Sequence, residues 1–231
     1  MKLLSIQVGL PRTIGAADAA DPMDREWTSG FIKEPILGSV EVTPTGLVGD
    51  GQSDLKNHGG PDKAINAYPA EYFSIWRDEL GLEFSAGAFG ENFTTEGALG
   101  SDVCIGDIYQ VGGIVVQITQ PRQPCWKLAR RWRIKDLAAR VEQTGRTGWY
   151  FRVLQIGAVE APAELTLVER PHPQWTVEEA NQIMHHRKTD WAAAAALAAC
   201  PALSASWRTS LALRAELKTV AATSARLQGN G

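Results

Sequence analysis

Cysteine is scarce in this sequence. Three cysteines occur among 231 residues, and Cys104, Cys125 and Cys200 lie far apart. No Cys-x-x-Cys pair is present, so we expect no iron–sulfur cluster carried by the chain itself. Three widely spaced cysteines do not build a disulfide framework, which favours a reducing, cytoplasmic location. We interpret Cys104 and Cys200 as buried core residues, the usual place of a free cysteine.

Long apolar runs and an excess of positive charge are also lacking. No stretch approaches about 18 uninterrupted apolar residues, the length that a membrane-spanning helix needs. The apolar run within residues 1–8 is too short for a signal peptide and predicts a first strand. The formal net charge of −3 argues against a general nucleic-acid-binding protein, since such proteins are normally basic. We therefore expect neither a membrane nor a nucleic acid as a partner.

Short β segments separated by glycine-rich turns make up most of the first 170 residues. One clear helix is expected over residues 69–80, where Tyr72, Phe73 and Trp76 share a face. Residues 11–30 show no period, and we expect a surface loop that could form a lid. Many short strands and few helices favour a closed or nearly closed barrel over an alternating α/β sheet. The predicted fold class is mainly β, of the α+β type.

The residue pattern changes after the Pro-His-Pro sequence that begins at residue 171. From there the pattern is helical, and Thr176, Asp190 and Ser204 can each cap a helix. We therefore predict two domains: a β-barrel domain over residues 1–170 and a small domain of three helices over residues 171–231.

The stretch around Cys125 combines features that activate a thiol. Residues 114–118 predict a strand before it, and an apolar stripe over residues 134–141 predicts a helix after it. Pro124 suits the first helical position, which would place Cys125 in the first turn, and a helix N-terminus and nearby cations both favour the thiolate. The cations nearby in the sequence are Arg122, Lys127, Arg130, Arg131 and Arg133. Cys125 is therefore the main candidate for a reactive side chain, the alternative being a buried core thiol.

Glycine-rich turns surround Lys63 and precede Asn92. Backbone N–H groups in such turns can form an anion-binding nest, and Lys63 is a suitable point charge for a phosphate. His58 could donate to the same anion, orient Cys125, or only close a turn. Asn92 could read the edge of a planar heterocycle or be an ordinary turn residue.

Two further features concern charged residues and histidines. Arg152 lies among strand residues, where an unpaired charge is costly, so we expect an anionic partner, either a ligand or a structural carboxylate. The neighbouring His185 and His186 lack the spacing of helical metal ligands, and we interpret them as surface residues.

The ordered set of motifs resembles the MOSC domain family, named for the C-terminal domain of molybdenum cofactor sulfurases, and within it the YiiM-like proteins. The matching segments are G-L-V-G-D at residues 46–50, His58-Gly59-Gly60 with Lys63, F-G-E-N-F at residues 89–93, Gln120-Pro121-Arg122 with Pro124-Cys125, and Trp149-Tyr150 with Arg152. The tail from Trp175 onward resembles the three-helix domain that YiiM-like proteins add. The resemblance implies a MOSC-type β-barrel that binds the molybdenum cofactor (Mo-molybdopterin), with Cys125 as the metal ligand.

The resemblance also implies an activity. YiiM-like proteins are linked to the reduction of N-hydroxylated bases such as 6-hydroxylaminopurine, so we expect a molybdenum-dependent oxidoreductase with Cys125 and His58 as catalytic residues. The residues expected to bind the cofactor are Lys33, Lys63, Asn92, Arg122 and Arg152. Without an iron–sulfur motif, the chain should need an external electron donor, such as a flavoprotein reductase. A homodimer is expected by resemblance alone, and the long, acidic loop at residues 11–30 could alter the substrate range.

Two other functions stay open on the sequence. The chain could be a non-redox carrier that delivers the cofactor, or a persulfide sulfur held on Cys125, to a partner. It could also be a cysteine hydrolase that uses Cys125 with His58 and needs no metal.

Overall fold

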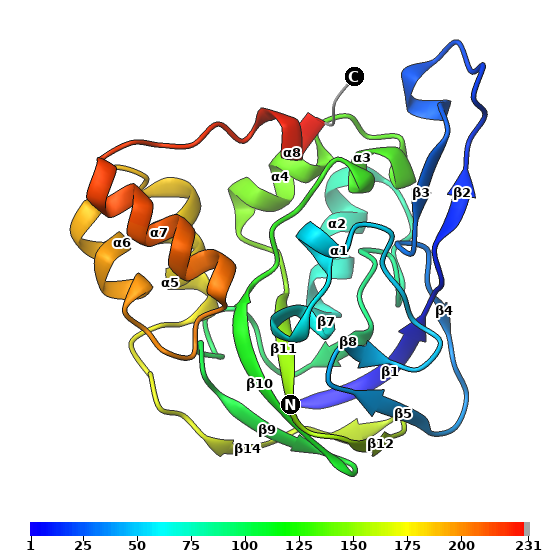
Figure 1. Ribbon diagram of the computed structural model, residues 1–231. Helices are drawn as coiled ribbons and strands as arrows, with labels where there is room; N and C mark the ends of the chain where they lie inside the picture. The colour runs from blue at the N-terminus through cyan, green and yellow to red at the C-terminus, as the bar shows by residue number, and fades with distance from the viewer. Residues whose placement is uncertain (229–231) are drawn as a thin grey trace.

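A curled sheet of nine strands forms the centre of the molecule (Figure 1). The structure is a computed structural model that describes residues 1–228, apart from the side chains of Lys56, Asn57 and Ser224. The strand order is β13–β1–β8–β7–β11–β10–β9–β14, with β4 also paired to β1. β7 and β8 are parallel, and the other pairs are antiparallel. The strands are β1 (Lys2–Val8), β4 (Glu34–Pro35), β7 (Ile65–Pro69), β8 (Phe93–Glu96), β9 (Ile108–Val111), β10 (Ile114–Pro121), β11 (Trp149–Gln155), β13 (Ala163–Glu164) and β14 (Thr166–Glu169).

A smaller sheet lies beside the first, and together they curl into a half-barrel around an apolar core. Its strands are β12 (Gly157–Val159), β5 (Val40–Thr43) and β6 (Gly46–Leu47). Alternate residues of β10, namely Ile114, Val116 and Ile118, are fully buried, as the two-residue period of a strand requires. Burying each such side chain stabilises the fold by about 1.5–3 kcal/mol. The predicted mainly β fold of the α+β type is confirmed.

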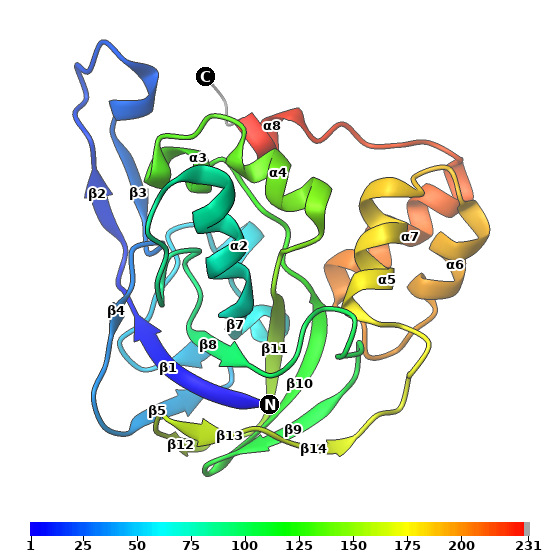
Figure 2. The ribbon, with the colours of Figure 1, turned by 180° about the vertical axis from the view of Figure 1, so that it is seen from behind.

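Four helices of the barrel part lie at one end of the sheet (Figure 1), and Figure 2 shows α2, α3 and α4 from behind. They are α1 (Leu55–His58), α2 (Glu71–Leu80), α3 (Lys127–Trp132) and α4 (Leu137–Thr144). α2 matches the helix predicted from its apolar face, and Gly81 ends it in the left-handed conformation, with φ of 66°. This face packs on a second, largely aromatic core, in which the rings of Tyr68 and Phe89 stack with centroids 4.3 Å apart.

Residues 11–30 form a β-hairpin, and our expectation of an irregular surface loop was wrong. The strands are β2 (Arg12–Ile14) and β3 (Trp27–Ser29). The hairpin projects from the body of the molecule (Figure 1), and Arg133 holds its tip through an ion pair of 3.0 Å to Asp21. Near its base, Trp27 packs edge-on against Trp126, with ring centroids 5.7 Å apart. These contacts join segments that are remote in the sequence, so no local period reveals them.

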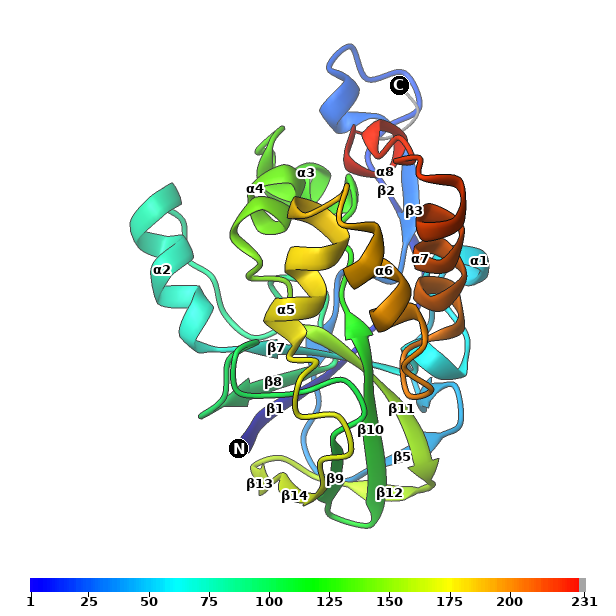
Figure 3. The same cartoon turned by 90° about the vertical axis from the view of Figure 1, so that its left-hand side faces the viewer.

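Three helices form a separate layer beside the sheet, here called the helical unit (Figure 3). They are α5 (Val177–Asn181), which continues as a π-helical turn (Gln182–His186), α6 (Trp191–Ala198) and α7 (Ala205–Leu217). The side chains of Thr176, Asp190 and Ser204 accept hydrogen bonds from backbone N–H groups, which confirms the three predicted caps. A further short helix, α8 (Ser224–Gln228), returns to the barrel and was not predicted. Over the described residues, no helix combines the length and the apolar character needed to cross a membrane.

Candidate functional site

A small cavity, here called the inner cavity, lies where the hairpin base, the glycine-rich turns, β7, β11 and the loop before α3 meet. Its volume is about 60 Å³. Most of the residues predicted for the site line it, although they come from distant parts of the chain. They are Lys33, His58, Lys63, Asn92, Arg122 and Cys125. The structure brings these six together.

Cys125 lies in the loop between β10 and α3 and lines the inner cavity. The side chain is 6% exposed. α3 begins at Lys127, so Pro124 is not the first helical residue and Cys125 precedes the first turn, contrary to our expectation. The Cys125 carbonyl instead accepts a hydrogen bond of 3.1 Å from the N–H of Leu128. Because α3 spans only six residues, nearby charged side chains dominate the electrostatics around the sulfur more than a helix dipole does.

Arg122 and Lys127 supply positive charge without carboxylate partners. Both are buried, and among the described residues no carboxylate lies within 4.0 Å of either cation. The Nη1 atom of Arg122 is buried and lacks a hydrogen-bond partner in the described part of the chain. Burying an unpaired cation costs several kcal/mol. The arrangement therefore fits a cavity that receives an anionic ligand.

The other arginines near Cys125 in the sequence point elsewhere, which corrects the basic surround that we predicted. Arg130 donates to the carbonyl of Arg25, and Arg133 pairs with the tip of the hairpin. Arg131 lies over the ring of Trp132, 5.2 Å from its centroid. Arg130 and Arg133 thus connect α3 to the hairpin, and none of the three arginines lines the inner cavity.

Lys33 lines the inner cavity as half of a buried ion pair with Asp50. Burial lowers the pKa of Lys33, and Asp50 opposes that shift. Asp50 also accepts a hydrogen bond of 2.9 Å from Nδ2 of Asn92, whose other amide proton goes to the carbonyl of Gln7. Both amide hydrogens of Asn92 are therefore used in hydrogen bonds within the protein. It lines the cavity while holding Asp50 and, through it, Lys33.

His58 and Tyr150 offer neutral polar groups to the cavity. Burial, and then the charges of Lys127 and Arg122, lower the pKa of His58 to about 4, so its imidazole is neutral near pH 7. Burial raises the pKa of Tyr150, which stays a protonated phenol. Burial likewise lowers the pKa of Lys63. Between Cys125 and His58, the described residues show no hydrogen bond.

Asn66 is a lining residue that the sequence analysis missed. It lies in β7 among fully buried apolar residues, and its Nδ2 donates to the carbonyl of Gly90 at 3.3 Å. Its Oδ1 is buried and has no partner within the described residues. Two buried polar atoms of lining residues, the acceptor Asn66 Oδ1 and the donor Arg122 Nη1, thus lack a partner among the described residues. In the sequence, the only sign that Asn66 belongs to the site was a polar residue inside an otherwise apolar strand.

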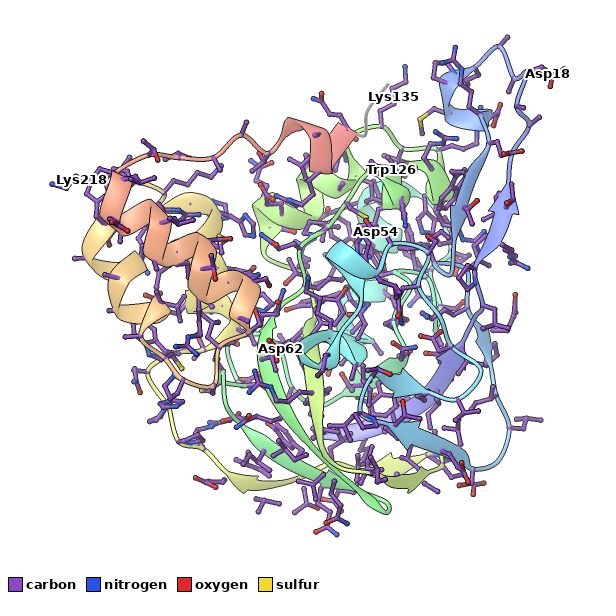
Figure 4. All side chains as sticks on the ribbon, in the orientation of Figure 1. Asp18, Asp54, Asp62, Trp126, Lys135 and Lys218 are labelled. Atoms are coloured by element: carbon purple, nitrogen blue, oxygen red, sulfur yellow. The ribbon has the colours of Figure 1, made fainter. Side chains whose placement is uncertain are left out.

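A larger hollow, here called the outer groove, adjoins the inner cavity and has a volume of about 550 Å³. Cys125, His58, Lys63 and Tyr150 line both spaces. The remaining walls come from the barrel, including Asp54 and Trp126 (Figure 4), and from helices α7 and α8. Ligand sites in proteins typically measure about 300–1,000 Å³, so the outer groove has room for a cofactor-sized group and the inner cavity for part of one. Cys125 thus belongs to the wall that the two spaces share.

Arg152, which we expected to bind the cofactor, lines neither the inner cavity nor the outer groove. It forms an ion pair of 2.8 Å with Asp62 and donates to the carbonyl of Ala202 at 3.2 Å. Asp62, beside the start of α7 in Figure 4, also accepts from the N–H of Ala205 at 2.8 Å. The structural carboxylate, one of the two partners considered for Arg152, is the one found. These contacts attach the helical unit to the barrel.

His185 also differs from expectation. It is buried, with 7% exposure, and its Nδ1 lies 3.2 Å from a carboxylate oxygen of Glu142, because the π-helical turn directs it toward α4. Its neighbour His186 is exposed. Within the described residues, no group of three or more His, Cys, Asp or Glu side chains could hold a metal ion.

Comparison with known proteins places this site in a family. Residues 54–166 match the MOSC domain, and residues 175–216 match the YiiM-like 3-alpha helix domain. Protein YiiM of Escherichia coli (strain K12) is 40% identical over 182 residues, which cover 78% of this chain and 81% of that protein. The chain belongs to the MOSC domain family. The crystal structure of YiiM from Geobacillus stearothermophilus superposes with a TM-score of 0.78 at 42% identity, covering 92% of this chain and 98% of that one.

Another relative, of lower identity, is named for an activity. A protein of Gibberella moniliformis (strain M3125 / FGSC 7600) named "Reductase" is 35% identical over 166 residues. The match covers 70% of this chain but 29% of that longer protein. Family membership supports binding of a molybdenum cofactor.

The residues of the site fit such a cofactor. A thiolate is a soft ligand suited to a metal of this kind. The unpaired Arg122 and Lys127 suit a phosphate, and the unpaired atoms of Asn66 and Arg122 suit a heterocycle that both donates and accepts hydrogen bonds.

Proposed function

We propose that this protein is a molybdenum cofactor-dependent reductase of N-hydroxylated compounds of the 6-hydroxylaminopurine type, with Cys125 as the protein ligand of molybdenum. The observation that carries the proposal is the position of Cys125, buried beside cations without carboxylate partners and shared between the inner cavity and the outer groove. A core thiol would be surrounded by apolar side chains.

Each lining residue has a role that follows from its state. Arg122 and Lys127 neutralise anionic groups of the bound cofactor, which supplies the two-electron chemistry. His58 is neutral near pH 7, so it can accept or donate one hydrogen bond without adding a positive charge. Tyr150 is a protonated phenol, and it donates to a ligand oxygen or nitrogen. Lys33 and Asn92 hold the wall of the cavity through Asp50.

The overall reaction fixes the partners. Converting an N-hydroxyl compound to the amine and water consumes two electrons and two protons. The three separate cysteines provide no iron–sulfur cluster, so the electrons come from a separate donor protein, such as a flavoprotein reductase. The small N-hydroxylated substrate enters through the outer groove, because the inner cavity alone is too small to hold it.

Metal content and turnover test the proposal together. Protein purified from a host that makes the molybdenum cofactor should carry near-stoichiometric molybdenum and reduce 6-hydroxylaminopurine with a chemical electron donor. Cys125→Ala should lose both properties, whereas Cys200→Ala, at an equally buried cysteine outside the cavity, should keep both. Molybdenum that stays bound in the Cys125→Ala protein would defeat the proposal.

The same experiment separates the alternatives. A non-redox carrier would hold molybdenum through Cys125 yet show no turnover with any electron donor. A cysteine hydrolase would cleave esters without molybdenum and lose that activity on alkylation of Cys125, but the absence of a Cys125–His58 hydrogen bond among the described residues disfavours it.

A further inference from the structure

The C-terminal segment returns to the neighbourhood of Cys125. After α7, residues 218–223 run across the molecule, and α8 then lies against α3 and α4 (Figures 1 and 3). Ala225 and Arg226 line the outer groove together with Cys125. The segment therefore belongs to the wall of the site, although the barrel domain ends far earlier in the sequence.

Arg226 contacts both residues that flank Cys125. Its guanidinium donates to the carbonyl of Pro124. Its own carbonyl accepts a hydrogen bond of 2.8 Å from the N–H of Trp126. One residue thus binds the backbone on each side of the thiol. Because α3 begins only at Lys127, the loop that carries Cys125 receives no helical hydrogen bonds at these two groups.

The position of Arg226 is itself fixed from two directions. Its guanidinium pairs with Glu142 of α4, which is 8% exposed. The same carboxylate lies 3.2 Å from Nδ1 of His185 in the helical unit. Hydrogen bonds between charged groups are stronger than neutral ones, and burial reduces solvent screening. Arg226 therefore connects the Cys125 loop, the barrel and the helical unit through one buried carboxylate.

We propose that Arg226 is a positioning residue for Cys125. By binding the carbonyl of Pro124 and the N–H of Trp126, it holds the loop so that the sulfur faces the shared wall of the inner cavity and the outer groove. Loss of Arg226 frees the loop and exposes the thiol to solvent. The consequence for reduction rests on the proposed function, whereas the effect on thiol exposure does not.

Alkylation of cofactor-free protein measures this effect directly. Native protein is treated with iodoacetamide, and mass spectrometry of the peptides gives a separate rate for each cysteine. In Arg226→Ala, the rate at Cys125 should rise at least about tenfold, since the hydrogen bond to the carbonyl of Pro124 and the ion pair with Glu142 are lost. Cys104 and Cys200, both buried elsewhere, should react at wild-type rates and so report on global folding. Arg208→Ala, on the exposed face of α7, should leave all three rates unchanged.

The outcomes separate positioning from general destabilisation. A Cys125 rate within twofold of wild type in folded Arg226→Ala overturns the proposal, and so does an equal acceleration at all three cysteines. Arg226→Gln, which is neutral and shorter, provides a second test and should also accelerate Cys125 selectively. If the reductase proposal fails because Cys125→Ala keeps its molybdenum, the alkylation result is unaffected, so the two failures are distinguishable.

Discussion

Removal of Asp50 should destabilise the protein far more than removal of a surface carboxylate. The side chains of Lys33 and Asp50 are 6% and 1% exposed. Asp50→Ala leaves the Lys33 ammonium buried without its counter-ion and also orphans the N–H of Gly9 and the amide of Asn92, each 2.9 Å from the carboxylate. Breaking a buried pair in this way costs about 3–5 kcal/mol. For a chain of this length, that corresponds to a fall in Tm of roughly 6–20 °C.

The assay is urea and thermal unfolding followed by circular dichroism, applied as a double-mutant cycle. Lys33→Met combined with Asp50→Ala should recover about 0.5–3 kcal/mol relative to the sum of the single changes, because no unpaired charge remains. Glu34→Ala serves as the control, since its pair with Arg12 spans 4.0 Å at 75% and 54% exposure. That change should cost less than about 0.5 kcal/mol. Additive single effects, or a loss below about 1 kcal/mol in Asp50→Ala, would refute the reasoning.

Three other predictions address separate parts of the structure. Burial lowers the pKa of His185 to about 4, so the unfolded chain takes up a proton on this histidine at higher pH than the folded chain does. Between pH 7 and pH 4, the free energy of unfolding should therefore fall by about 3 kcal/mol more in wild type than in His185→Gln. Parallel pH profiles of the two proteins would contradict this. Gly148→Ala should lower the free energy of unfolding by roughly 1–3 kcal/mol or more. The φ angle of Gly148 is +68°, and the new Cβ would lie 2.2 Å from the carbonyl oxygen of Ala67. An unchanged melting curve would contradict this. Arg152→Met should speed amide hydrogen exchange at the start of α7, because the ion pair between Arg152 and Asp62 is lost. The molybdenum content should stay unchanged. Loss of molybdenum with unaltered exchange would instead indicate that Arg152 binds the cofactor.

The sequence was informative where local pattern decides the outcome. The caps at Thr176, Asp190 and Ser204 and the aromatic face of α2 depend on residues within a few positions, and all of them are found. The gathering of Cys125 with His58 could be expected only through the ordered motifs, because the two residues are far apart in the chain.

The sequence was misleading where long-range partners decide the outcome. The sequence placed Arg133 among the cations near Cys125, whereas in the structure Arg133 pairs with the two carboxylates of the hairpin tip. His185 has no local sign of burial, since its carboxylate partner lies 43 positions earlier at Glu142. Asn66 lies in an apolar strand, and only the three-dimensional arrangement shows that it lines the cavity and that its side-chain oxygen has no partner among the described residues.

Molybdenum K-edge X-ray absorption of the cofactor-loaded protein tests the central claim most directly, because it counts the sulfur atoms bound to the metal. Serine, unlike alanine, keeps an oxygen that can bind the metal in place of the sulfur, so the wild-type protein should show one more sulfur neighbour than Cys125→Ser loaded in the same way, and Cys200→Ser should match wild type. Identical sulfur coordination in wild type and Cys125→Ser would contradict the assignment of Cys125 as the ligand.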